Sequence, residues 1–203
     1  LLGTLLQAGI ALGISIADTL FLTNVGSEKL PIIYIAMPFI MLVSTPLFSF
    51  LTSRFGIDKL FRSVLILLAT CGILFLFITS LYASKGSSIL WISYVVKFYV
   101  ALWYIYIYTL YWNFIDGYFD ILDAKRLFSF FSGGMAIGAM LGGVLVMLFI
   151  SFLKVEQLFG VWSVLALVAL PLVLLLQRKY KKIEAEEGEE KESGFFEQTK
   201  RVV

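Results

Sequence analysis

Residues 158–177 read LFGVWSVLALVALPLVLLLQ, and this stretch contains no charged side chain. An α-helix rises about 1.5 Å per residue, so roughly 20 apolar residues cross a hydrocarbon layer about 30 Å thick. The stretch ends where Arg178 and Lys179 open a segment rich in charge. The pattern predicts a transmembrane helix over residues 158–177.

The same pattern recurs earlier in the chain, over residues 1–22, 32–52, 60–82, 89–115 and 127–153. Inside lipid each span must satisfy its own backbone hydrogen bonds, and long apolar runs without alternation do this as α-helices. Of the 203 residues, 60% are hydrophobic and 15% charged, a balance too apolar for a water-soluble domain. We predict an all-α membrane protein with a six-transmembrane-helix bundle over residues 1–177.

Basic residues between the spans predict the orientation of this bundle, because positively charged loops stay on the cytoplasmic side. One set of flanking segments carries Arg54, Lys59, Arg62, Lys125, Arg126, Arg178, Lys179, Lys181 and Lys182. The alternate connections carry Lys29, Lys85 and Lys154. We therefore expect both ends of the chain in the cytoplasm, in an integral protein of the bacterial inner membrane surrounded by lipid.

The segment 178–203 is rich in Lys and Glu, which cannot form an apolar core. We predict a charged cytoplasmic linker, either a solvated helix or a disordered chain. Phe195 and Phe196, followed by Lys200 and Arg201, leave open an amphipathic stretch that lies on the membrane surface.

The composition also excludes several classes of function. The chain has no His and one Cys, Cys71, so it lacks the commonest general base, the usual zinc ligands and an internal disulfide. It has neither a convincing catalytic pair nor a phosphate-binding glycine loop. A net charge of +2 is too small to indicate a nucleic-acid partner. We predict no enzyme activity, no metal site and no cofactor.

The strongest candidate for a binding residue is Lys97, inside the fourth span. Ala101, Tyr104, Tyr108 and Tyr111 follow it at helical steps of three and four residues, on the same face. An ammonium beside phenol rings suits an anionic or aromatic ligand near the membrane midplane. The alternative is a structural lysine, which pairs with a carboxylate elsewhere or extends to the membrane surface.

A second polar face lies on the first span, where Gln7, Ala11, Ser15 and Asp18 follow helical spacing. We expect this face to point into the protein, with Gln7 among the substrate-binding residues. Acids inside spans are costly and mark functional positions, so Asp18 is a candidate gate or proton-linked carboxylate. The alternative for Asp18 is a carboxylate that is solvated or paired with another helix near the interface.

Charged residues also cluster after the fourth span, where Asp116, Asp120 and Asp123 precede Lys125 and Arg126. Opposite charges at the ends of spans can hold one face of a transporter closed and release it when helices move. This segment is therefore a candidate cytoplasmic gate. The alternative is an ordinary solvated turn in which Asp123 caps the next helix.

In the fifth span, Gly134, Gly138 and Gly142 recur every four residues, with Gly133 and Gly143 beside them. Small residues at this spacing let another helix approach closely. We predict helix packing along this strip, and a backbone site for a ligand is the alternative.

The connection after the second span resembles that of major facilitator superfamily transporters, which often carry a Gly, an Asp-Arg pair, a Gly and further basic residues there. Arg54, Gly56 and Lys59 match this pattern. Ser49 and Ser53 replace the expected Gly and Asp, which puts the gating salt bridge of that family in doubt, although the resemblance implies a gating role for Arg54.

More of the chain is similar to the nonmitochondrial ATP/ADP carrier group and its bacterial relatives. The similarity rests on Asp18-Thr19-Leu20-Phe21-Leu22, Gly26, Leu30-Pro31, Tyr34-Ile35, Asp116, Asp120, Ala124-Lys125-Arg126-Leu127-Phe128, Gly133-Gly134, Gly138 and Gly142-Gly143. It implies the N-terminal half of a major facilitator-type fold, with a C-terminal six-helix half that this chain lacks. Nucleotide exchange is among the activities that the resemblance implies.

We therefore expect a secondary transporter that moves a small anionic solute, with nucleotides among the candidates, by alternating access. The alternative is a membrane anchor or structural subunit of a larger membrane complex, inactive in transport.

Overall fold

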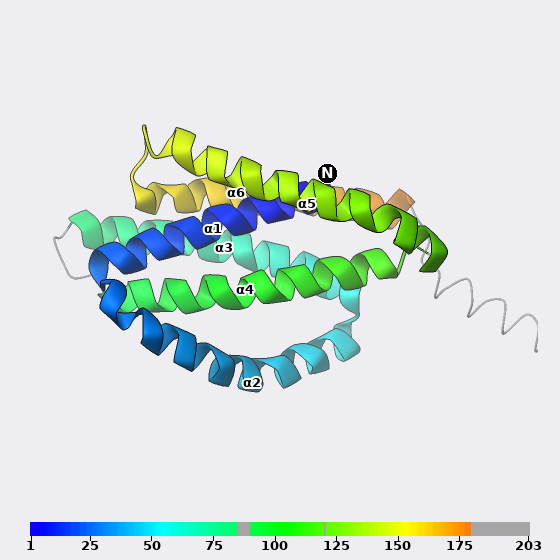
Figure 1. The fold of residues 1–203 in the computed structure, drawn as a ribbon, viewed down its shortest axis with the longest axis horizontal. Coiled ribbons are helices and arrows are strands. Elements are labelled where there is room, and N and C mark those ends of the chain that lie inside the picture. The colour runs from blue at the N-terminus through cyan, green and yellow to red at the C-terminus, as the bar shows by residue number, and fades with distance from the viewer. Residues whose placement is uncertain (85–89, 120, 180–203) are drawn as a thin grey trace, which may run out of the picture.

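The computed structural model describes residues 1–84, 90–119 and 121–179, and this part of the chain is helical with short connections (Figure 1). The long helices are α1 (Leu2–Asn24), α2 (Leu30–Phe55), α3 (Ile57–Ser84), α4 (Leu90–Asp116), α5 (Ile121–Phe149) and α6 (Leu158–Lys179). Short 3-10 turns, η1 (Ser27–Lys29) and η2 (Val155–Gln157), precede α2 and α6. All six helices are long and apolar enough to cross a membrane. In the described part of the chain, the prediction of an all-helical fold with six helices that could span a membrane is confirmed.

Several helices extend past the apolar runs that predicted them. Helix α1 continues to Asn24, whose side-chain amide donates a hydrogen bond of 2.8 Å to the Leu20 carbonyl. Helix α5 begins at Ile121, six residues before the predicted span, so Lys125 and Arg126 belong to a helix. Charged residues are good helix formers, and a helix does not have to end where the hydrocarbon layer ends. The predicted linker from 178 onward also starts inside α6, while residues 180–203 lie outside the described part.

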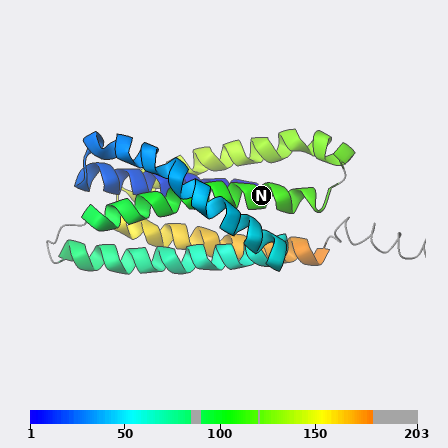
Figure 2. The same ribbon diagram turned by 90° about the horizontal axis from the view of Figure 1, so that it is seen from below.

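Helix α1 is the centre of the bundle. It packs against α4, α5 and α6, whereas α3 packs against α6 and α4 behind it (Figures 1 and 2). Leu12, Ile16 and Phe21 of α1 are fully buried in this core. In the most apolar stretch of α1, 56% is buried inside the bundle, whereas in the corresponding stretch of α2 the buried share is 6%. The position of α1 therefore determines which polar side chains of the other helices can meet it.

Helix α2 bows away from the bundle and crosses it obliquely (Figures 1 and 2). Pro38 and Pro46 lie inside it, and proline removes a backbone donor and clashes with the preceding turn, which bends a helix. The Phe48 ring stacks on the Tyr106 ring of α4 with centroids 4.4 Å apart. The Tyr106 hydroxyl also donates a hydrogen bond to the Ser44 hydroxyl. These contacts attach α2 to α4 near the middle of both helices.

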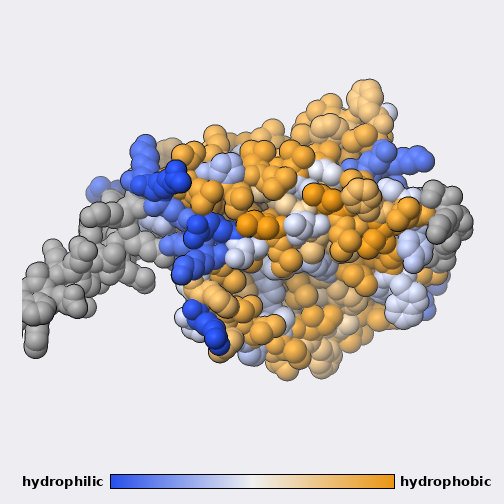
Figure 3. Space-filling view, turned by 180° about the vertical axis from the view of Figure 1, so that it is seen from behind, coloured by the Kyte–Doolittle hydropathy of each residue, from blue (hydrophilic) through white to orange (hydrophobic). Residues whose placement is uncertain are grey.

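The surface seen from behind is apolar across its middle and hydrophilic at its two ends (Figure 3). Leu42, Leu74 and Met140 are 75%, 54% and 72% exposed on α2, α3 and α5. In water such exposure would favour aggregation, but in a bilayer these side chains contact lipid tails. The distribution therefore matches a bundle surrounded by hydrocarbon.

The glycine strip of α5 lies against α1. A methyl group added at Gly138 would lie 2.8 Å from the Thr4 Cα, and one at Gly142 would lie 2.6 Å from the Ala8 carbonyl oxygen. One at Gly134 would lie 3.3 Å from the Thr4 Oγ1. The two backbones therefore approach at distances that a larger residue would not allow.

Gly142→Ala should weaken this contact. Its added methyl group would displace the Ala8 backbone, whereas Gly143 has nothing within 4 Å of an added Cβ. We expect Gly142→Ala to lower the free energy of unfolding by about 1–3 kcal/mol, and Gly143→Ala to leave it unchanged. Unfolding of the purified protein in mixed detergent and SDS measures both. Equal effects of the two substitutions would contradict this packing.

Candidate functional site

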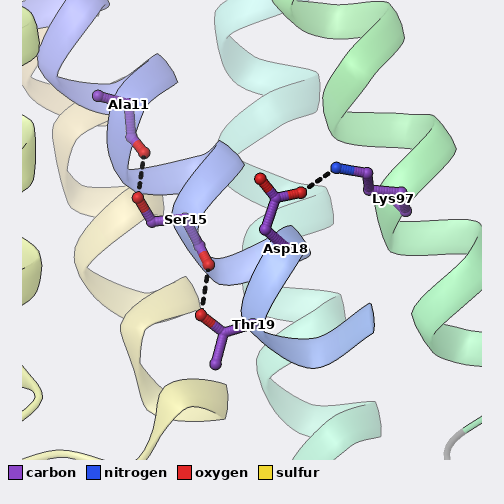
Figure 4. A network of polar contacts seen from close by, with 5 residues as sticks. All are labelled: Ala11, Ser15, Asp18, Thr19 and Lys97. Carbon is purple, nitrogen blue, oxygen red and sulfur yellow. Dashed lines mark hydrogen bonds and ion pairs between the residues drawn. The ribbon is translucent and has the colours of Figure 1, made fainter. Parts of the chain in front are cut away.

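An ion pair joins α1 and α4 inside the membrane-spanning part of the bundle. The Lys97 ammonium of α4 contacts the Oδ1 atom of the Asp18 carboxylate of α1 (Figure 4). The Lys97 side chain is 13% exposed and the Asp18 side chain 42% exposed. A charge is expensive to hold in a hydrocarbon layer, and pairing with the opposite charge reduces that cost. Sequence analysis left the partner of Lys97 open, and the structure places Asp18 there.

The two charges meet because α1 and α4 are neighbours that run in opposite directions. At 1.5 Å per residue, Asp18 lies roughly 10 Å from the last residue of α1, and Lys97 lies a similar distance from the first residue of α4. Those two residues, Asn24 and Leu90, are at the same end of the bundle. The pair therefore lies within both spans, closer to one membrane interface than to the other.

Two hydroxyl groups beside Asp18 are satisfied within their own helix. The Ser15 hydroxyl donates to the Ala11 carbonyl at 2.9 Å, and the Thr19 hydroxyl donates to the Ser15 carbonyl at 2.8 Å (Figure 4). Hydroxyl groups commonly bond to the carbonyl four residues earlier in this way. The Asp18 carboxylate, by contrast, extends across to α4.

A pocket of about 140 Å³ adjoins Lys97 between the same two helices. It is lined by Ile14 and Ala17 of α1 and by Lys97, Val100, Ala101 and Tyr104 of α4. A water molecule occupies about 30 Å³ of liquid, so the pocket has room for about four or five waters. The pocket therefore has room for a small oxyanion group, and Lys97 is the charged residue of its lining.

Tyr104 and Tyr108 extend from this pocket along α4. Their rings are 40% and 42% exposed, and their centroids lie 6.4 Å apart. The Tyr108 ring also meets the Trp112 ring edge-on, with centroids 6.2 Å apart. The structure therefore brings Lys97, Tyr104 and Tyr108 to one face, as the helical spacing predicts, and adds Trp112 to it.

Tyr111 does not share that open face. Its side chain is 3% exposed, and its hydroxyl lies beside Gly3 of α1. Tyr111 follows Tyr108 by three residues, so its side chain points about 60° away from that of Tyr108 around the helix axis. This direction leads from the open face toward α1. Tyr111 therefore packs in the core, at the opposite end of the α1–α4 contact from Asp18.

Gln7 lies on α1 about three turns from Asp18. Its Oε1 atom is buried and has no hydrogen-bond partner in the described part of the chain. Gln7 is not among the residues that line the pocket at Lys97. The structure thus separates Gln7 from the ion pair, although both belong to the same polar face of α1.

The structure describes some, but not all, of the residues of the candidate cytoplasmic gate. Arg54 is exposed in the last turn of α2, with its guanidinium carbon 5.9 Å from the centroid of the Phe50 ring. Asp116 and Arg126 are also exposed, and no ion pair joins any two of Arg54, Asp116 and Arg126. Asp120 and the side chain of Lys125 lie outside the described part. The role of this segment stays a prediction.

A contact that could not be predicted from the sequence joins α3 and α6. The Asp58 carbonyl accepts hydrogen bonds of 3.4 Å from the Arg62 Nε and from the Gln177 Nε2 of α6. Burial raises the pKa of the nearby Tyr118 hydroxyl, the Asp58 carboxylate raises it further and Arg62 lowers it. The sequence shows that Asp58 and Arg62 are four residues apart, which is the spacing of neighbours on one face of a helix. It does not show that Gln177 of α6 lies beside them. These contacts fasten the bundle at the end where α3 begins.

Comparisons with known proteins gave no match to a family model, to a characterised protein or to a solved structure. The resemblance to major facilitator transporters therefore rests on the motif residues alone.

The ion pair predicts non-additive effects on stability. Asp18→Asn leaves the well-buried Lys97 ammonium without its carboxylate, whereas Lys97→Met leaves a carboxylate that is already half-exposed. We expect Asp18→Asn to lower the free energy of unfolding by about 1–3 kcal/mol and Lys97→Met to lower it by less, because the ammonium is the more deeply buried of the two charges. The double variant should be more stable than Asp18→Asn. Unfolding in SDS measures the free energies of this double-mutant cycle. If the effects of the two single substitutions simply add in the double variant, the pairing is contradicted.

Proposed function

We propose that this chain is one six-helix bundle of a secondary transporter of the major facilitator type, which moves a small anionic solute by alternating access. A second six-helix bundle would complete the transporter. The observation that carries the proposal is Lys97, a charged residue within a candidate membrane span that lines a pocket with room for a small oxyanion. The motifs shared with the nonmitochondrial ATP/ADP carrier group support it and add nucleotides to the candidate solutes.

Exposure of polar groups supports placing the solute path along α1 and α4. Asp18 of α1 and Tyr104 and Tyr108 of α4 are each about 40% exposed. A charged carboxylate that faces lipid tails costs several kcal/mol, so such a face is expected to meet water or protein. The face shown in Figure 3 is apolar across its middle and suits lipid. A water-filled path between two bundles would give the exposed polar side chains of α1 and α4 their water.

The chemistry of the site favours an anion that also carries a ring. Lys97 offers positive charge and three N–H donors, which suit a phosphate or carboxylate group. A pocket of about 140 Å³ admits that group but not a whole nucleotide. The remainder of such a solute would lie over the open rings of Tyr104 and Tyr108, where stacking is favourable.

The proposed orientation places the end with Arg54, Lys59, Arg62, Arg126, Arg178 and Lys179 in the cytoplasm of a bacterial cell. Both ends of this chain then face the cytoplasm, and the ion pair lies nearer the outer interface. The charged residues around α2 and α5 would serve as the cytoplasmic gate.

A second candidate is a membrane anchor or structural subunit. The ion pair itself favours it, because a Lys97 ammonium that already has a carboxylate partner can simply join α1 to α4. In that role the charge of Lys97 would stabilise the bundle and would not bind a solute.

Transport assays on the full-length protein in liposomes distinguish the two. With labelled nucleotides, inorganic phosphate and sugar phosphates, Lys97→Gln should reduce binding and uptake roughly tenfold or more, because it removes a charge-assisted contact. Lys29→Gln, in the exposed connection before α2, is the matched control and should leave both unchanged. Unchanged binding by Lys97→Gln would remove this residue from the mechanism, and an absence of uptake by the wild type would favour the anchor.

A further inference from the structure

The two members of the ion pair differ in what else they face. Lys97 contacts Asp18 and also lines the pocket of about 140 Å³. Asp18 is not among the residues that line this pocket. Ile14 and Ala17, which precede Asp18 on α1, form the α1 side of the pocket instead. Lys97 therefore adjoins both the Asp18 carboxylate and an open pocket that has room for an anion.

The two side chains also differ in how firmly they are held. The Lys97 side chain is 13% exposed, whereas the Asp18 side chain is 42% exposed. The described contact joins the ammonium to one carboxylate oxygen, Oδ1. In the proposed water-filled path, water replaces the partner of the half-exposed carboxylate when it turns away, but the ammonium in its buried position needs an anion nearby. Asp18 is therefore the replaceable member of the pair.

We propose that Asp18 is a built-in competitor for the Lys97 site, displaced when a small oxyanion enters the adjoining pocket. This inference rests on the proposed function and adds the regulation of its binding site. An ammonium attracts either anion, but two anions at one ammonium repel each other, so binding of the solute weakens the contact with Asp18. Asp18 keeps the site closed to weakly bound anions while no solute is present.

Displacement of Asp18 has a consequence for the helices. The ion pair is the polar link between α1 and α4 near this end of the bundle (Figure 4). When the oxyanion holds Lys97, this link opens and the contact between α1 and α4 at this end of the bundle is weakened. A solute that binds one arrangement of the helices better than the other shifts the population toward it. Binding at Lys97 is thereby coupled to the movement that alternating access requires.

The first experiment measures binding of inorganic phosphate and of sulfate to the purified full-length protein. Asp18→Asn should bind at least one of them about fivefold or more tightly than the wild type, the lower end of usual coupling between two ligands. Gly143→Ala, which meets open space, is the control and should bind as the wild type does. The proposal is overturned if folded Asp18→Asn binds both anions no more tightly than the wild type does, or if it binds neither detectably. If Lys97→Gln also binds as the wild type does, the proposed function fails with it; if Lys97→Gln loses binding, only the competitor role fails.

The second experiment uses the wild type, so it does not depend on whether Asp18→Asn folds. Dicyclohexylcarbodiimide condenses a carboxylate with a neighbouring amine into an amide, and it should crosslink Asp18 to Lys97, as peptide mass spectrometry would detect. Sulfate should reduce the yield of this crosslink at least severalfold in a saturable manner, whereas chloride at equal ionic strength should not. A yield that sulfate does not change overturns the proposal.

Discussion

A charged ammonium cannot remain in a hydrocarbon layer without an anion or water beside it, and the account of this bundle depends on how Lys97 meets that constraint. The Asp18 carboxylate reaches it from α1, so the charge of one helix is satisfied by its neighbour. Lys97 also lines a small pocket between α1 and α4. A stabilising contact and a candidate binding site therefore share one side chain.

The packing of α1 makes this meeting geometrically feasible. Glycines of α5 let the α1 backbone approach closely, and buried residues such as Leu12 and Ile16 hold it against the other helices. Helix α2 is held more loosely, through Tyr106 and its neighbours on α4. The bundle thus combines a tightly packed centre with a helix at its edge that is little buried.

Much of the helical arrangement could be predicted from the sequence, because hydrocarbon thickness determines how long an apolar run must be. The spacing of Gly134, Gly138 and Gly142 also indicated a packed face, though not that α1 covers it. The partner of Lys97 could not be predicted, since Asp18 lies 79 positions away in the chain and only the packing of α1 against α4 brings it near. The core position of Tyr111 depends on the same packing.

Crosslinking between α1 and α4 tests the central claim most directly. In a Cys71→Ser background, Asp18→Cys and Lys97→Cys should be joined in high yield in native membranes by a short bifunctional thiol reagent. Asp18→Cys with Leu42→Cys, on the exposed side of α2, should give little product. Efficient joining of positions 18 and 97 supports a site between α1 and α4, and a yield no higher than that of the control pair would contradict it.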